Sequence, residues 1–187
     1  MDGPIMSLDS LPTQLSGRCI ALVGLMGAGK TNIGRRLAAR LGLPFRDTDF
    51  EIEQDARCSI AELFARHGEA DFRDRERCVI RRLLAGVPSV LATGGGAFMD
   101  AGTRAAMRQR AVSVWLRCDV PVLLRRLAAS TDRPLLQGGD PAEILQRLMT
   151  LRNPVYAEAD LVLDGIDESP DVTTTKVLAA LQTWRLP

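Results

Sequence analysis

The chain has 187 residues, of which 46% are hydrophobic and 25% are charged, the balance expected of one soluble globular domain. The formal net charge of +1 argues against general binding to nucleic acid or membrane surfaces. The four cysteines form no C-x-x-C pair, which favours a reducing cytoplasm over a zinc site or a disulfide framework. Residues 1–17 predict neither a secretory signal nor a transit peptide, and no stretch predicts a membrane span. We expect a frayed or disordered extension at 1–17 and a single domain at 18–187.

Short apolar runs alternate with amphipathic helical patterns along the chain. This alternation predicts an α/β fold, a three-layer sandwich with a five-stranded parallel sheet. The expected strands are 19–24, 44–48, 89–93, 111–117 and 160–164. Helices are expected at 33–41, from a capping box at Ser59–Glu62 to Gly68, at 72–86, after Asp119, after Asp140, and over about 171–184.

Residues 24–31 read Gly-Leu-Met-Gly-Ala-Gly-Lys-Thr, the pattern G-x-x-x-x-G-K-[ST], between a predicted strand and a predicted helix. Glycines let backbone N–H groups close around a triphosphate, and the following helix adds the positive end of its dipole. Lys30 is expected to reach the β- and γ-phosphates, and the Thr31 hydroxyl to ligate Mg²⁺. The pattern predicts a site for a nucleoside triphosphate and magnesium; the alternative is a glycine-rich turn without a ligand.

Two carboxylates, Asp47 and Asp49, follow the second predicted strand. Residues i and i+2 of an extended segment point to the same face, so we expect both to face the phosphate-binding loop. One would hold water molecules on Mg²⁺, and the other would meet a substrate hydroxyl. The alternative is helix capping, because Glu51 and Ile52 begin a helical pattern and Asp49 is a fair N-cap. The position beside the loop favours the functional interpretation.

Three glycines, Gly94, Gly95 and Gly96, follow the third predicted strand, where many phosphate-loop enzymes carry an aspartate. They offer unhindered N–H groups where a backbone must approach a small ligand closely. An ordinary flexible turn is the alternative. Because three glycines exceed what a turn needs and weaken packing, we favour a ligand-binding role.

Arginines supply further candidates. Arg73, Arg75 and Arg77 lie in a charged helix, where pairing with acids on a solvated face is the alternative to a site. Arg133 lies in the segment 130–140, which lacks an apolar stripe and is expected to form a mobile lid. Arg152 lies in the helix after that segment. Taken singly, each of these side chains fits the protein surface better than a site.

Six blocks, in this order, give the chain a specific likeness. They read Gly-Leu-Met-Gly-Ala-Gly-Lys-Thr-Asn-Ile-Gly, Asp-Thr-Asp-x-x-Ile-Glu, Gly-Glu-Ala-Asp-Phe-Arg-Asp-Arg-Glu, Ala-Thr-Gly-Gly-Gly, Arg-Pro-Leu-Leu and Arg-Asn-Pro-Val-Tyr. The series resembles shikimate kinase over about residues 18–165. The resemblance implies a P-loop fold of the nucleoside-monophosphate-kinase type with a mobile lid. It also implies transfer of a phosphoryl group from ATP to the 3-hydroxyl of shikimate, a step of chorismate and aromatic amino-acid biosynthesis, with Mg²⁺ as cofactor.

The resemblance also implies roles for individual residues. The ATP-binding set is Gly27, Ala28, Gly29, Lys30, Thr31, Asn32, Arg126 and Arg133. The shikimate-binding set is Asp49, Arg73, Gly95 and Arg152. Lys30, Asp49 and Arg133 are the implied catalytic residues; Thr31 is the direct magnesium ligand, and Asp47 acts through water. The sequence leaves open whether Asp49 is a general base or only orients the hydroxyl.

Three other functions are alternatives. An inactive relative kept for binding is disfavoured, because every residue expected to be essential is present. A gluconate kinase of the same fold would share Lys30 and Thr31 but has no need for Asp49, Arg73 and Arg152. A GTP-binding switch would carry an N-K-x-D motif, and none occurs. We therefore expect a cytoplasmic, monomeric enzyme whose partner is a small substrate, with no nucleic-acid or membrane partner.

Overall fold

A computed structural model describes residues 15, 17–128, 139–164 and 167–185. Its five strands form one sheet, in which every neighbouring pair is parallel, in the order β2-β3-β1-β4-β5. The strands are β1 (Cys19–Val23), β2 (Phe45–Asp47), β3 (Val90–Ala92), β4 (Ala111–Leu116) and β5 (Leu161–Leu163). Each lies within its predicted range, which confirms the α/β assignment.

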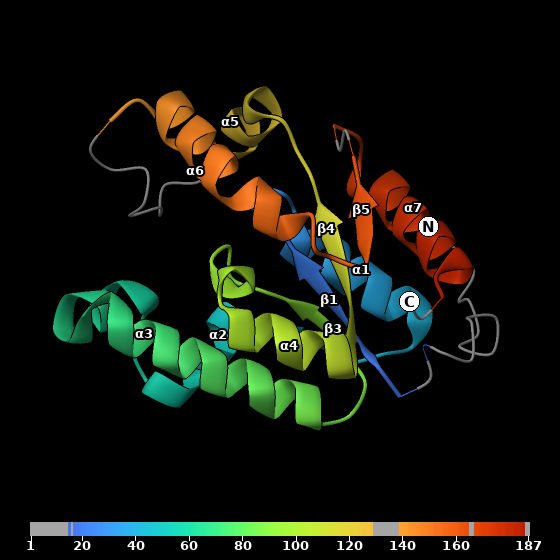
Figure 1. Cartoon of the computed structure of the whole chain (residues 1–187), viewed down its shortest axis with the longest axis horizontal. Helices are drawn as coiled ribbons and strands as arrows, with labels where there is room; N and C mark the ends of the chain where they lie inside the picture. Colours follow the sequence, from blue (N-terminus) through green and yellow to red (C-terminus); the bar gives the residue numbers. More distant parts are fainter. Residues whose placement is uncertain (1–14, 16, 129–138, 165–166, 186–187) are drawn as a thin grey trace.

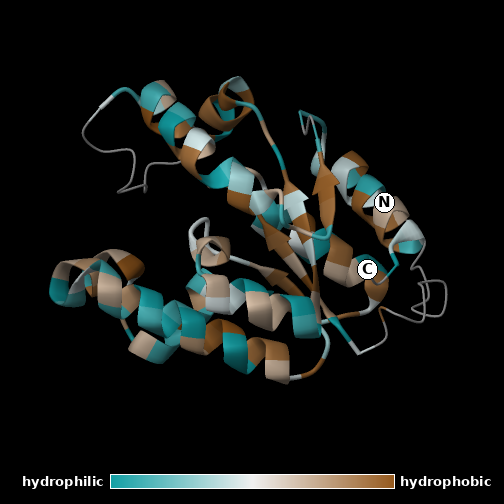
Figure 2. Cartoon of the chain, viewed as in Figure 1, coloured by the Kyte–Doolittle hydropathy of each residue, from teal (hydrophilic) through white to brown (hydrophobic). Residues whose placement is uncertain are grey.

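The sheet is the centre of the hydrophobic core. Every residue of β1 and of β4 is buried, and Ile20 of β1 pairs with Val90 on one side and Val112 on the other. Strands covered on both faces need apolar side chains at every position, which explains the unbroken apolar runs in the sequence. Figure 2 shows these hydrophobic strands between helices whose outer surfaces are hydrophilic.

Helices cover both faces of the sheet. They are α1 (Lys30–Leu41), α2 (Thr48–Ala56), α3 (Ile60–Ala85), α4 (Ala101–Arg110), α5 (Val120–Ala128), α6 (Pro141–Tyr156) and α7 (Pro170–Thr183), with a 3₁₀ turn at Ala97–Met99. In Figure 1, α1 and α7 lie on one side of the sheet and α3 with α4 on the other, while α5 and α6 extend from one end. This is the predicted three-layer arrangement. Within the described ranges, no helix combines the length and apolar character needed to cross a bilayer.

Three local features refine the sequence interpretation. The break expected at Gly68 is confirmed, since this residue interrupts α3 with φ 77° and ψ 178°. The helix α4 was not predicted, because it buries only Thr103 and Met107 and so carries almost no apolar stripe. The N-cap of α2 is Asp47 rather than Asp49, since Asp47 Oδ1 accepts the Asp49 N–H at 3.1 Å.

Parallel strands end at one edge of the sheet, where ligands of open α/β folds bind. The segments that leave this edge are 24–29 after β1, 48–49 after β2, 93–96 after β3 and 117–119 after β4. Every described candidate residue is on or beside these segments, or on the helices packed against them. Arg133 and most of the expected lid lie outside the described residues, as do residues 1–14 and 16 of the expected extension.

Candidate active site

The phosphate-binding loop, residues 24–31, joins β1 to α1 as predicted. Lys30 is buried, with 9% of the residue exposed, and its ammonium donates to the carbonyl oxygens of Gly24 at 2.8 Å and Leu25 at 2.9 Å. The helix starts at Lys30, so its first N–H groups face the loop. The loop therefore places a cation and the positive end of a helix dipole at one position, which suits polyphosphate.

Thr31 and Asp47 form the expected pair beside this loop. Thr31 Oγ1 donates to Asp47 Oδ2 at 2.8 Å. Hydroxyl and carboxylate oxygens are suitable Mg²⁺ ligands, so this pair fits a magnesium site next to the phosphate-binding loop.

The prediction that Asp47 and Asp49 lie on one extended segment is wrong, although a hydrogen bond joins the two residues. The extended segment ends at Asp47, and Asp49 already belongs to the first turn of α2. Asp49 instead reaches the loop after β3, where its Oδ1 would lie 2.9 Å from a Cβ placed on Gly94.

In the glycine loop, Gly94–Gly96, other side chains pack closely against the first and last glycine. A Cβ on Gly94 would meet Glu76 Oε1 at 2.6 Å, and one on Gly96 would meet the terminal nitrogens of Arg73 at 2.6 Å. The Gly94 N–H donates to the buried Thr48 hydroxyl at 3.0 Å. Glycine at positions 94 and 96 thus lets two carboxylates and a guanidinium pack directly against this backbone.

The two predicted substrate arginines meet at this glycine loop from different helices. Arg73 of α3 pairs with Glu76 at 2.7 Å and with Glu69 at 3.2 Å. Arg152 of α6 donates through Nη1 to the Gly95 carbonyl at 3.2 Å. Burial lowers the pKa of Arg73, but Glu76 and then Glu69 outweigh it and raise the pKa above its usual value. Arg73 therefore stays cationic at any physiological pH.

The neighbouring arginines of the same helix behave as the alternative interpretation expected. Arg75 pairs with Asp71 at 2.6 Å, and Arg77 pairs with Asp74 and, at 3.8 Å, with Asp100. Their acid partners are all more than a third exposed, so these pairs are surface pairs. Only Arg73 of the three belongs to the site.

Glu76 lies in this cluster of side chains, whereas the sequence analysis considered the acids of this helix only as partners on a solvated face. Its side chain is 3% exposed and its Oε1 has no hydrogen-bond partner among the described residues. Burial raises the pKa of Glu76, Arg73 lowers it and Asp49 raises it again, and the net pKa is above the usual value. Glu76 lies four residues after Phe72 and three before Val79, so it shares the buried face of α3 with these apolar residues. This helical spacing in the sequence could have identified Glu76 as buried.

The predicted nucleotide residues outside the loop's core also lie near it. Arg126 Nη1 donates to the Ala28 carbonyl at 3.3 Å and lies 3.7 Å from Cys118 Sγ, so this side chain crosses the loop. The Asn32 side chain accepts a hydrogen bond from Arg36.

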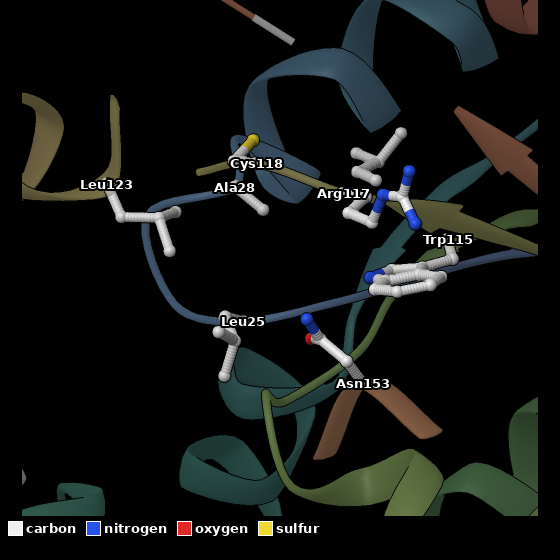
Figure 3. Close-up of a pocket in the computed structure, with 8 residues that line it drawn as sticks. Leu25, Ala28, Trp115, Arg117, Cys118, Leu123 and Asn153 are labelled. Atoms are coloured by element: carbon white, nitrogen blue, oxygen red, sulfur yellow. The ribbon is translucent and has the colours of Figure 1, made fainter. Parts of the chain in front are cut away.

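Figure 3 shows a small pocket that borders the phosphate-binding loop. Leu25 and Ala28 contribute from the loop, Trp115, Arg117 and Cys118 from β4 and the segment after it, Leu123 from α5, and Asn153 from α6. The pocket therefore lies where the loop meets the helix that carries Arg152.

Comparisons with known proteins agree on one family. The family model described as "Shikimate kinase" matches residues 26–182. A shikimate kinase of Paramagnetospirillum magneticum is 55% identical over 168 residues, covering 90% of this chain and 86% of the relative. The structure of shikimate kinase from Acinetobacter baumannii in complex with shikimate is 38% identical with a TM-score of 0.84, covering 91% of this chain and 97% of that one. A gluconokinase structure from Sinorhizobium meliloti is 20% identical with a TM-score of 0.60, covering 88% and 91%, and shares the fold alone.

Proposed function

The chain belongs to the shikimate kinase family and phosphorylates a hydroxyl group of shikimate with ATP; we propose that Arg73 and Arg152 bind the substrate carboxylate and that Asp49 binds the reacting hydroxyl. The observation that carries this proposal is the meeting of the two arginines, from α3 and α6, at the glycine loop. Two guanidinium groups at one small site match a carboxylate through paired, charge-assisted hydrogen bonds.

The distribution of charge around the glycine loop supports a substrate that is an acid at one end and a polyol at the other. Asp49 and Glu76 approach Gly94, whereas Arg73 approaches Gly96. Carboxylate oxygens accept hydrogen bonds from hydroxyl groups, and arginines donate to the carboxylate. The Gly95 backbone is proposed to add a contact to the ring substituents between these ends.

Magnesium is proposed to bind at the Thr31 hydroxyl directly and at Asp47 through water. Thr31 Oγ1 and Asp47 Oδ2 lie 2.8 Å apart, and both are oxygen atoms of the kind that Mg²⁺ prefers as ligands, which supports this assignment. When bound there, the metal neutralises charge on the phosphate oxygens.

In the proposed reaction the substrate hydroxyl oxygen forms a bond to the γ-phosphorus, and the bond from that phosphorus to the bridging oxygen breaks. ADP leaves with the electron pair of the broken bond, and the hydroxyl proton passes to the Asp49 carboxylate. Phosphoryl transfer depends mainly on alignment and positive charge, which Lys30 provides. Arg133 is proposed from the family resemblance to add a second cation, and Arg126 to contact the adenine side of the nucleotide.

We further propose that residues 18–187 act as one domain, that segment 130–140 closes over the bound substrates, and that the enzyme works as a cytoplasmic monomer. All four cysteines are free thiols, which suits a reducing compartment. The large exposed apolar side chains of the described residues are spread over separate segments, which favours a monomer. They are Phe50, Val87, Leu151, Val162 and Val172.

A coupled assay of ADP release, with shikimate, quinate and gluconate as acceptors and with and without Mg²⁺, tests this function. We expect magnesium-dependent turnover with shikimate. Turnover with gluconate in place of shikimate would overturn the assignment of the substrate site.

A further inference from the structure

Tyr156, the only tyrosine of the chain and the last residue of α6, is buried beside the glycine loop with its hydroxyl turned to that loop. Its ring stacks on Trp115 at 5.6 Å and on Phe98 at 6.3 Å between centroids. The hydroxyl donates a hydrogen bond to the Gly95 carbonyl. A buried side chain packed against two other rings has little freedom, so this hydroxyl is a fixed donor.

The Gly95 carbonyl is shared by two donors, the Tyr156 hydroxyl and Arg152 Nη1 at 3.2 Å. The two residues are four positions apart on α6 and therefore lie on one face of the helix. A buried carbonyl left without any donor is costly. Because Tyr156 satisfies this oxygen, Arg152 is able to turn its charge to another acceptor without leaving the carbonyl unpaired.

The same hydrogen bond sets the direction of the loop's N–H groups. In a planar trans peptide, the Gly95 carbonyl and the Gly96 N–H point in opposite directions, so holding one aims the other. The Gly94 carbonyl is held in the same way by the Ala97 N–H at 3.1 Å, which aims the Gly95 N–H. No acceptor within the described ranges bonds to either N–H. The N–H groups of Gly95 and Gly96 therefore have fixed directions and are available to a ligand.

We propose that Tyr156 is a positioning residue for shikimate: its hydroxyl holds the Gly95 peptide, so that the loop N–H groups face the substrate and Arg152 is available to the substrate carboxylate. This inference rests on the proposed function of Arg152 and Gly95. Burial raises the pKa of Tyr156 to about 12, so the hydroxyl keeps its proton throughout any ordinary assay.

The test is Tyr156→Phe, which keeps the ring in its stack and removes only the hydroxyl. We expect KM for shikimate to rise about tenfold, and KM for ATP and kcat to change by less than about threefold, because one oriented hydrogen bond serves only the acid site. The matched control is Thr174→Val. Thr174 is a fully buried residue of α7 whose hydroxyl also donates to a backbone carbonyl, that of Pro170 at 2.6 Å. This control should lose stability without a change in KM.

A second variant separates the hydrogen bond from the packing. Phe98→Leu reduces the stack on Tyr156 but keeps its hydroxyl and its contact with Trp115, so we expect a lower unfolding temperature and a smaller rise in KM for shikimate than in Tyr156→Phe. The amide nitrogen of Gly96 should shift in the NMR spectrum of Tyr156→Phe and not in that of Thr174→Val. An unchanged KM for shikimate in Tyr156→Phe, an equal rise in KM for both substrates, or an equal rise in Phe98→Leu would each overturn the proposal. Failure of the wild-type protein to phosphorylate shikimate would instead overturn the proposed function.

Discussion

Thr31 donates its hydroxyl to one oxygen of the Asp47 carboxylate at 2.8 Å, and the other oxygen of that carboxylate accepts the Asp49 N–H at 3.1 Å. One side chain thus connects the phosphate-binding loop with the residue proposed to bind the substrate hydroxyl. We expect the alignment of the γ-phosphate with that hydroxyl to depend on this connection, because reacting groups must be held close together and in line.

The first prediction concerns magnesium. Asp47→Asn replaces one carboxylate oxygen by an amide NH₂ group and removes the negative charge. We expect the half-saturating Mg²⁺ concentration to rise about tenfold, because one contact to a charged group is lost. Asp55→Asn is the matched control, since Asp55 lies on α2, the helix that Asp47 caps, and pairs with Arg82 at the surface. Steady-state rates measured against Mg²⁺ concentration check the prediction, and identical Mg²⁺ dependence in both variants would contradict it.

The second prediction concerns the carboxylate-binding arginines. Arg73→Ala or Arg152→Ala should weaken shikimate binding by about 1.5–3 kcal/mol and spare ATP binding, since each removes one charge-assisted contact. Arg75→Ala is the control, because Arg75 is on the same helix as Arg73 but pairs with Asp71 at the surface. Calorimetric titration with each substrate provides the measurement. Unchanged shikimate affinity in both site variants would show that the acid end binds elsewhere.

The third prediction concerns pH. The pKa of Glu76 lies above its usual value of 4.5 in the folded protein, so the native state holds its proton more tightly than the unfolded state. The stability from this group is present below about pH 4.5 and is lost as the pH rises through the raised pKa. Glu76→Gln, which carries no titrating group, should therefore gain stability relative to the wild-type protein as the pH rises through that range. Urea unfolding at a series of pH values checks this.

The control for that series is Glu69→Gln, which removes the exposed carboxylate that also pairs with Arg73. This variant should show no comparable gain. If Glu76→Gln and the wild-type protein keep a constant difference in the free energy of unfolding across the range, the elevated pKa is wrong.

The fourth prediction concerns the Thr48 hydroxyl, which accepts the buried Gly94 N–H at 3.0 Å. Thr48→Val removes the acceptor and keeps the shape, so it should lower the free energy of unfolding by about 1–3 kcal/mol, the effect of leaving a buried donor unpaired. Thr183→Val, at an exposed hydroxyl near the end of α7, should change it by less than about 0.5 kcal/mol. Equal effects in the two variants, measured by urea unfolding, would refute the proposed importance of the Gly94 contact.

The sheet could be predicted from the sequence because buried parallel strands need unbroken apolar runs, and such runs stand out between polar segments. Asp49 and Gly95 could be placed near the edge of the sheet because each follows the end of a predicted strand. Arg73 and Arg152 were proposed through the family resemblance, because each arginine taken singly fits a surface position better than a site.

What the sequence analysis missed depends on contacts between distant segments. The contacts of Glu76 result from the packing of α3 against the glycine loop, and the proposed role of Tyr156 results from the contact of α6 with Gly95. Asp49 does lie just after β2, as predicted, but it is not on an extended segment, since α2 begins one residue before it. Local patterns fix the elements, whereas side-chain partners depend on how those elements pack.

The affinity of shikimate and of its methyl ester, measured by calorimetry for the wild-type protein and for Arg152→Ala, tests the central claim most directly. The ester removes the negative charge and adds one methyl group, so the wild-type protein should bind it at least about tenfold more weakly than the acid, as expected for lost charge-assisted hydrogen bonds. In Arg152→Ala this preference should shrink to a few-fold. An undiminished preference for the acid in Arg152→Ala would contradict the assignment of the carboxylate to this arginine.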